Sequence, residues 1–154
     1  MASKRKQILA QLKSNMAAIS TAGGYNYDVA KATLKFLPWS EVHEFPVLIV
    51  IAGDEEAQEA TQNPNGAYYR SRFDFSIVGY AQFDTDTQDD GNASDAEENL
   101  VEDIKKALAA DPLLGGLVEE CVWDKVLSWV DHDQNVTIVE VQGHVVFQHL
   151  DSEP

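Results

Sequence analysis

The sequence is poor in cysteine, in basic residues and in long apolar segments. Cys121 is the only cysteine among 154 residues, so an intrachain disulfide is excluded, and its apolar neighbours indicate a small buried side chain rather than a nucleophile. Only 11 residues are Lys or Arg, against 26 Asp or Glu, which gives a formal net charge of −15. Because phosphate binding needs clustered cations, specific binding of nucleic acid is not expected. No run approaches the ~20 apolar residues of a membrane span, and no apolar signal segment follows the charged N-terminus. We therefore expect synthesis in a cytoplasm and no membrane partner.

The remaining composition fits one folded domain over residues 1–154. The hydrophobic fraction of 44% is ordinary for a globular protein of this length. Apolar periodicity predicts two amphipathic helices and five strands, in the order helix, three strands, helix, two strands. The expected ranges are 3–20, 27–37, 45–52, 68–83, 94–110, 121–131 and 136–150. This order predicts an α+β fold, with an antiparallel-dominated sheet of about five strands and the two main helices packed on one face.

The second helix carries the strongest local signals. Ser94 and Glu97 have the spacing of a capping box, and Asp111 before Pro112 is expected to end the helix. Apolar residues recur at helical spacing and predict a face that covers the sheet: Ala96, Leu100, Val101, Ile104, Ala107 and Leu108.

An acidic stretch, residues 53–66, is expected to be a long loop at the tip of a hairpin. Its four carboxylates, Asp54, Glu55, Glu56 and Glu59, lack histidine neighbours or an apolar pocket that would tune them for catalysis or metal binding. Long loops in compact domains are often binding elements, so these residues are candidates for a protein interface.

The segment before the second helix approaches the pattern of a calcium loop. Asp86, Asp90 and Glu97 fall near ligand positions, but Gln88 replaces the usual Asp or Asn and a strand enters where a helix should. Helix capping explains the same residues, so they remain weak metal candidates and no cofactor is expected.

The sequence contains no glycine-rich phosphate loop, nucleophile elbow or paired-cysteine motif, and no enzyme is indicated. Its tryptophans favour packing or association instead. Trp39 is either an interface anchor or a core residue under a loop, and Trp129 is a further interface candidate. Lys4 and Arg5 in the first helix either dock an acidic partner or a neighbouring copy, or are simply solvated.

Four segments resemble the tail terminator, or minor tail, proteins of long-tailed bacteriophages with non-contractile tails. They are GYNYDVAK at 24–31, FPVLIVIAGDEE at 45–56, RFDFSIVGYAQ at 72–82 and NLVEDIKKALAADPLLGGL at 99–117. The helix followed by Asp-Pro-x-Leu-Gly-Gly is the most specific of these matches, and none of the matching residues is catalytic.

The resemblance implies a small α/β sandwich that assembles into a homo-hexameric ring in the virion, at the neck between head and tail. Such a ring caps the tail tube, ends its polymerisation and presents a surface to the head-completion or connector protein. Genome DNA would pass an electronegative lumen without specific binding. The resemblance also suggests that a divalent cation aids association, with Asp86 and Asp90, or Asp54 and Glu55, facing neighbouring copies. The alternatives are another neck or tail-completion component, and, in a different class, a metal-binding protein or enzyme.

Overall fold

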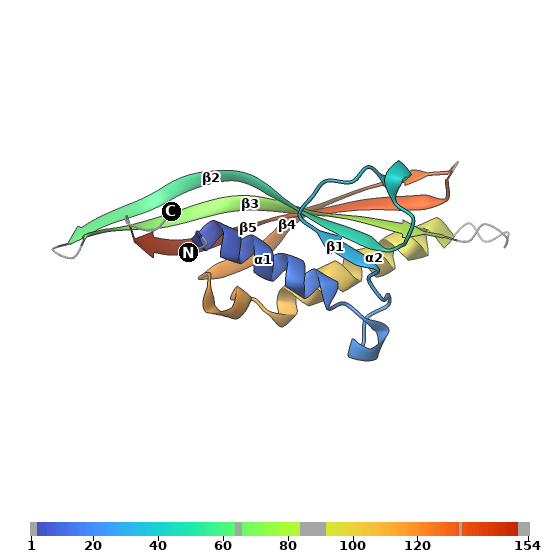
Figure 1. Cartoon of the computed structure of the whole chain (residues 1–154), viewed down its shortest axis with the longest axis horizontal. Coiled ribbons are helices and arrows are strands. Elements are labelled where there is room, and N and C mark those ends of the chain that lie inside the picture. The colour runs from blue at the N-terminus through green and yellow to red at the C-terminus, as the bar shows by residue number, and fades with distance from the viewer. Residues whose placement is uncertain (1–2, 64–65, 84–91, 133, 151–154) are drawn as a thin grey trace.

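The computed structural model of this protein describes residues 3–63, 66–83, 92–132 and 134–150. Figure 1 shows two helices and a long, twisted sheet. The helices are α1 (Lys4–Ala17) and α2 (Asn92–Ala110), and the strands are β1 (Lys31–Thr33), β2 (Val47–Asn63), β3 (Gly66–Gln82), β4 (Glu120–Asp131) and β5 (Val136–Leu150). Three short 3-10 turns complete the described elements: η1 (Thr21–Gly23), η2 (Trp39–Glu41) and η3 (Leu114–Gly116).

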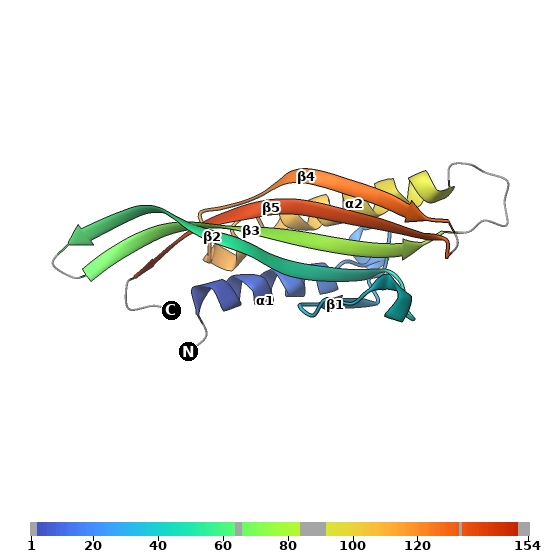
Figure 2. The ribbon, with the colours of Figure 1, turned by 90° about the horizontal axis from the view of Figure 1, so that it is seen from above.

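The strands form one sheet in the order β1-β2-β3-β5-β4. Only the short β1–β2 pair is parallel, and the other three pairs are antiparallel. Both helices lie on the same face of this sheet (Figures 1 and 2). The predicted order of elements and the α+β class are confirmed.

The main core lies between the helices and the sheet. Ile8, Leu12 and Met16 of α1 and Leu100 and Ile104 of α2 are fully buried, as their helical spacing predicts. They meet alternate residues of the strands, including Phe73, Phe75, Ile77, Val139, Val141 and Phe147. Gly79 lies beneath this layer, where an added Cβ would come within 2.9 Å of both Leu48 and Leu100 side chains. The absence of a side chain at this glycine therefore leaves room for the two leucine side chains.

A second, smaller core covers part of the opposite face. Ile49 of β2, Tyr80 of β3 and Ile138 of β5 are buried there under the connector between β1 and β2. The Tyr80 hydroxyl donates a hydrogen bond of 2.8 Å to the Leu37 carbonyl, which fixes this connector on the sheet. Because β5 lies between β3 and β4 and has buried side chains on both faces, it is a central strand of the sheet.

The expected strand at 27–37 is wrong in extent, since only Lys31–Thr33 pairs with β2. The backbone before it bonds elsewhere. The buried Asp103 carboxylate accepts hydrogen bonds from the N–H groups of Asn26 (2.8 Å) and Tyr27 (2.9 Å), and Val29 N–H donates to Ile19. These contacts hold the segment between the two helices rather than on the sheet.

The expected acidic loop at 53–66 is also wrong: β2 continues to Asn63 and β3 begins at Gly66. Glu56 stands opposite Arg72 and Glu59 opposite Arg70 in the strand register, so opposite charges favour the pairing. We call residues 53–63 and 66–74 the hairpin arm. Figures 1 and 2 show that it extends past the ends of both helices.

The helix ends differ from the prediction in detail. Helix α2 begins at Asn92, so Ser94 lies inside it and the expected capping box is not formed. Glu97 instead accepts a hydrogen bond of 2.7 Å from the Ser128 hydroxyl of β4. The end at Ala110 is as expected. Helix α1 ends at Ala17, and the left-handed glycine, Gly24 (φ 88°), follows η1 rather than α1.

Candidate functional site

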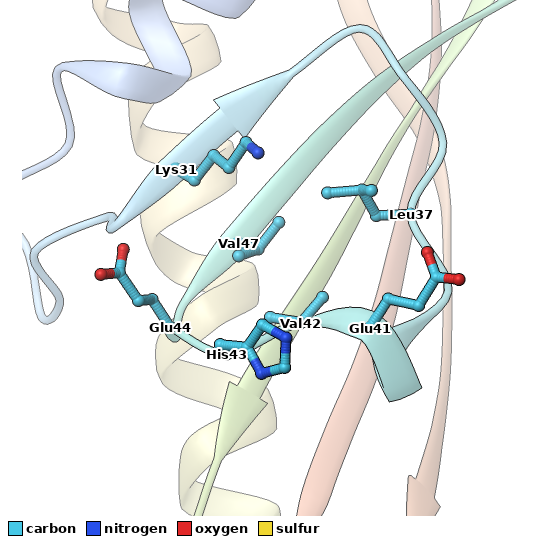
Figure 3. Close-up of a pocket in the computed structure, with 7 residues that line it drawn as sticks. All are labelled: Lys31, Leu37, Glu41, Val42, His43, Glu44 and Val47. Atoms are coloured by element: carbon cyan, nitrogen blue, oxygen red, sulfur yellow. The ribbon is translucent and has the colours of Figure 1, made fainter.

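A small depression lies beside β1, where the connector turns back into β2 (Figure 3). Its volume is about 220 Å³, and it is lined by Lys31, Leu37, Glu41, Val42, His43, Glu44 and Val47. In Figure 3 the charged groups of Lys31, Glu41 and Glu44 stand apart around an apolar floor. The arrangement suits contact with a side chain of a partner better than acid–base chemistry, for which donor and acceptor must be within hydrogen-bonding reach.

A larger polar depression of about 420 Å³ lies at the base of the hairpin arm. Arg72 contacts Asp74 (Nε–Oδ1, 3.3 Å) and Asp124 (4.0 Å), and His144 Nδ1 lies 2.7 Å from Asp124 Oδ2. Glu120 lies 3.7 Å from the other ring nitrogen of His144. These side chains join β3, β4 and β5 across the free face of the sheet. Among the described residues, no three His, Cys, Asp or Glu side chains are placed to hold a metal ion.

Cys121 is buried against the main core, as its neighbours in the sequence indicate. Burial, with a smaller effect from the charge of Asp111, raises the pKa of its thiol to about 12. The thiol therefore stays protonated at neutral pH, which is the behaviour of a structural cysteine.

Arg5 and Glu55, two of the candidate interface residues, are brought together by the fold. Arg5 Nη1 lies 3.2 Å from Glu55 Oε1, and Nη2 donates a hydrogen bond of 2.7 Å to the Gly53 carbonyl. The guanidinium also lies 4.9 Å from the centre of the Phe73 ring. Arg5 thus ties the start of α1 to the hairpin arm, and a role in binding a partner remains a prediction for both residues.

The other candidates lie at separate places. Lys4 begins α1, Asp54 and Glu56 are exposed on the hairpin arm, and Trp129 is 50% exposed on β4. Glu59 lies in β2 and Trp39 in η2. Of the weak metal candidates, Glu97 bonds to Ser128, while Asp86 and Asp90 lie outside the described residues.

Two exposed apolar side chains were not anticipated from the sequence. Leu34 and Phe36 follow β1 and are 46% and 60% exposed. The available signal was the apolar residues on either side of Lys35, which a three-residue edge strand cannot bury. Trp123 on β4 is 44% exposed, and the Lys105 ammonium of α2 lies 3.9 Å from its ring centre.

Comparisons with known proteins do not show a family for this chain. No protein-family model and no curated protein matches the chain. Among solved structures, a chain in the virion of a native gene transfer agent particle is similar, with a TM-score of 0.39 and 11% identity over 92% of this chain and 94% of that chain. At that level the similarity carries no argument about function. Within the described residues, neither helix is long and apolar enough to span a membrane.

Proposed function

We propose that this chain is a structural virion protein, the tail terminator of a long-tailed phage or phage-like particle. In this proposal six copies form a ring that caps the tail tube, ends tube polymerisation and provides the docking surface for the head-completion protein. The role is one of binding, without catalysis.

The observation that carries the proposal is where the family-like segments lie in the fold. The stretch 45–56 contains the buried start of β2, 72–82 is the C-terminal part of β3, and 99–117 covers most of α2 with η3. These three segments pack on one another in the main core. The resemblance therefore concerns the residues that determine the fold, and the surfaces around them are left for assembly.

Both lateral edges of the sheet suit assembly into a ring. Within the described residues, β1 pairs with β2 only from Val47 to Ile49, and β4 has β5 on one side only. Unpaired strand edges are templates for association with another chain. Because the two edges differ, contact between them would be head-to-tail, the kind of interface that generates rings.

We assign the hairpin arm as the surface that binds the tail tube or the head-completion protein. The end of the arm extends past the helices (Figure 1), and the connector that bears Trp39 is the second candidate. A divalent cation that relieves repulsion at Asp54 would strengthen association. An oligomer distribution that is the same with magnesium and with a chelator would contradict this part.

The test is to add the purified protein to polymerising tail tube protein and to measure tube lengths by electron microscopy. Tubes should be shorter and should carry a ring of six copies at one end. A protein that binds the head-completion protein but leaves tube growth unchanged would instead be another neck component. A protein that binds neither would disprove the proposal.

A further inference from the structure

The charge of the chain is divided unevenly along the sequence. Residues 1–40 contain six Lys or Arg and a single Asp, a net charge of +5, whereas the remaining residues carry five basic and 25 acidic side chains, a net charge of −20. Helix α1 has four basic residues and no acidic one, and α2 has five acidic residues and two lysines.

The fold places these helices on opposite flanks. Helix α1 packs against β1 and β2, and α2 packs against β3, β5 and β4. Figure 2 shows α1 along the β1–β2 side and α2 behind β4 and β5. The helical layer therefore has one basic and one acidic flank.

The charged groups of both flanks are exposed. Lys6 and Lys13 are seven residues apart on α1, and Lys31 is exposed on β1. We call these three residues the basic flank. Asp95, Glu98 and Glu102 are exposed at spacings of three and four on α2, so they share one side of the helix, and we call them the acidic flank. Within the described part of the chain, none of the six side chains forms an ion pair, so their charges are available to another molecule.

We propose that the basic flank of one copy docks on the acidic flank of the next copy. Two copies that each carry −15 repel one another wherever acidic surfaces meet. Helix α1 is the helix of opposite sign, so contact of α1 with α2 of a neighbour turns repulsion into attraction. The contact uses different surfaces of the two copies, and repetition of such a contact forms a ring when the rotation between copies closes. This inference rests on the proposed ring and names the surfaces that build it.

Apolar groups accompany each flank. Leu34 and Phe36 lie just after β1 on the basic side, and Trp123 lies beneath Lys105 on the acidic side. Stable interfaces combine an apolar centre with a charged rim. The ion pairs between the flanks then set the direction and register of the contact. The apolar side chains beside them add buried area.

A charge swap tests the proposal. One variant carries Lys6→Glu with Lys13→Glu, and a second carries Glu98→Lys with Glu102→Lys. Each alone presents two flanks of the same sign, so self-association measured by light scattering should weaken by about tenfold or more. An equimolar mixture of the two variants should associate like the wild type. When the variants alternate around a ring, every flank meets a flank of opposite sign, and a ring of six copies allows complete alternation. The chain with all four substitutions should also associate.

Lys125→Glu on β4 is the matched control for Lys13→Glu alone, since both change the net charge equally and Lys125 is exposed outside the basic flank. It should weaken association less than Lys13→Glu does, because Lys125 lies on β4 and belongs to neither flank. Circular dichroism of every variant checks that the fold is retained.

Carbodiimide cross-linking of mixed isotope-labelled and unlabelled protein gives a second readout that does not depend on ring size. Cross-links between Lys6 or Lys13 of one copy and Glu98 or Glu102 of another are expected at high protein concentration. Their absence, or swap variants that associate like the wild type, overturns the inference.

The variant with Lys6→Glu and Lys13→Glu is also tested for binding to duplex DNA. If it loses DNA binding but still associates, the inference is overturned and the basic flank is assigned to nucleic acid. Tube capping is measured separately. If the wild-type protein caps tubes but its copies do not contact one another through the flanks, the flank contact is refuted and the proposed function stands. Flank contacts without capping would refute the function alone.

Discussion

Single charged residues in this chain serve the fold as well as the surface. Asp103 is almost fully buried, yet its two oxygens are occupied by the N–H groups of Asn26 and Tyr27. Burial, and then the charge of Asp103, raise the pKa of the neighbouring Tyr27 hydroxyl. Such a carboxylate is costly to bury unless its hydrogen bonds are made, so it specifies how the segment after α1 is held against α2.

Gly143 is a position where even one methyl group should be harmful. A Cβ there would overlap the Val122 carbonyl of β4 and come within 2.6 Å of the Phe75 ring. Gly143→Ala should therefore lower the free energy of unfolding by about 1–3 kcal/mol, as overpacking does. Urea denaturation measures the loss. Gly23→Ala is the control, because its Cβ would meet atoms only at 3.5 Å and beyond; equal losses in both variants would contradict the explanation.

Replacing the buried hydroxyl of Thr137 by an apolar group should make the protein more stable. Its hydroxyl is fully buried in β5 and has no hydrogen-bond partner among the described residues. Thr137→Val replaces that hydroxyl by a methyl group, so the free energy of unfolding should rise by about 1 kcal/mol. Thermal melting measures the gain. A lower melting temperature for the valine variant would show that the hydroxyl is satisfied in solution.

Asp111 should make the stability pH-dependent. Hydrogen bonds from the Asn15 side chain, the Gly115 N–H and the Gln11 side chain lower the pKa of its carboxyl from the ordinary 3.8. A depressed folded-state pKa stabilises the protein above 3.8, and this contribution disappears as the pH falls through the folded-state value. The stability advantage of wild type over Asp111→Asn should therefore shrink below that pH in denaturation curves. An advantage that is constant down to about pH 2 would show that the carboxylate charge is not involved.

At the scale of elements, the sequence was sufficient to predict a helix or strand where one face of that element is apolar. Helix α2 follows its periodicity closely, because burial against a single core leaves one unbroken apolar face. Strands β3 and β5 were also recognised, although both contribute side chains to the second core as well. The hairpin arm was missed because its acidic residues resemble a loop until Arg70 and Arg72 are known to lie opposite. Strand β1 was overextended because Asp103, distant in sequence, binds the preceding backbone.

The candidate surfaces were less predictable than the fold. The cations of the first helix were recognised as possible contacts, but only the fold shows that Arg5 is held by Glu55 while Lys6 and Lys13 are free of ion pairs within the described residues. The acidic flank of α2 was not recognised as a contact surface from the sequence. Which strands α2 packs against, and so where this flank lies, depends on the fold.

The hairpin arm should tolerate charge reversal in its fold but not in its binding. Asp54→Lys changes one exposed carboxylate and leaves both the Arg5–Glu55 ion pair and the Glu56–Arg72 cross-strand pair in place. If the arm meets a partner, joining of tails to heads should fall by about tenfold, because opposed charges steer and orient such contacts. Joined particles are counted by electron microscopy. The neutral variant Asp54→Asn should be intermediate, and unchanged joining in both variants would exclude this carboxylate from the contact.

At the scale of the whole molecule, two electrostatic effects with different ranges act on association. The net charge of −15 repels copies at long range, and the flanks attract only in contact. The Debye length falls from about 30 Å at 0.01 M salt to about 10 Å at 0.1 M and about 3 Å at 1 M. Long-range repulsion is therefore screened first, and contact ion pairs are screened at higher salt.

Self-association should consequently pass through a maximum near about 0.1 M salt, with weaker association at about 0.01 M and about 1 M. Sedimentation across a salt series measures it. The variant with Lys6→Glu and Lys13→Glu has repulsion at both ranges, so its association should only rise with salt. A wild type that also rises steadily would mean that apolar contacts such as Phe36 hold the copies together and that the charged flanks contribute nothing.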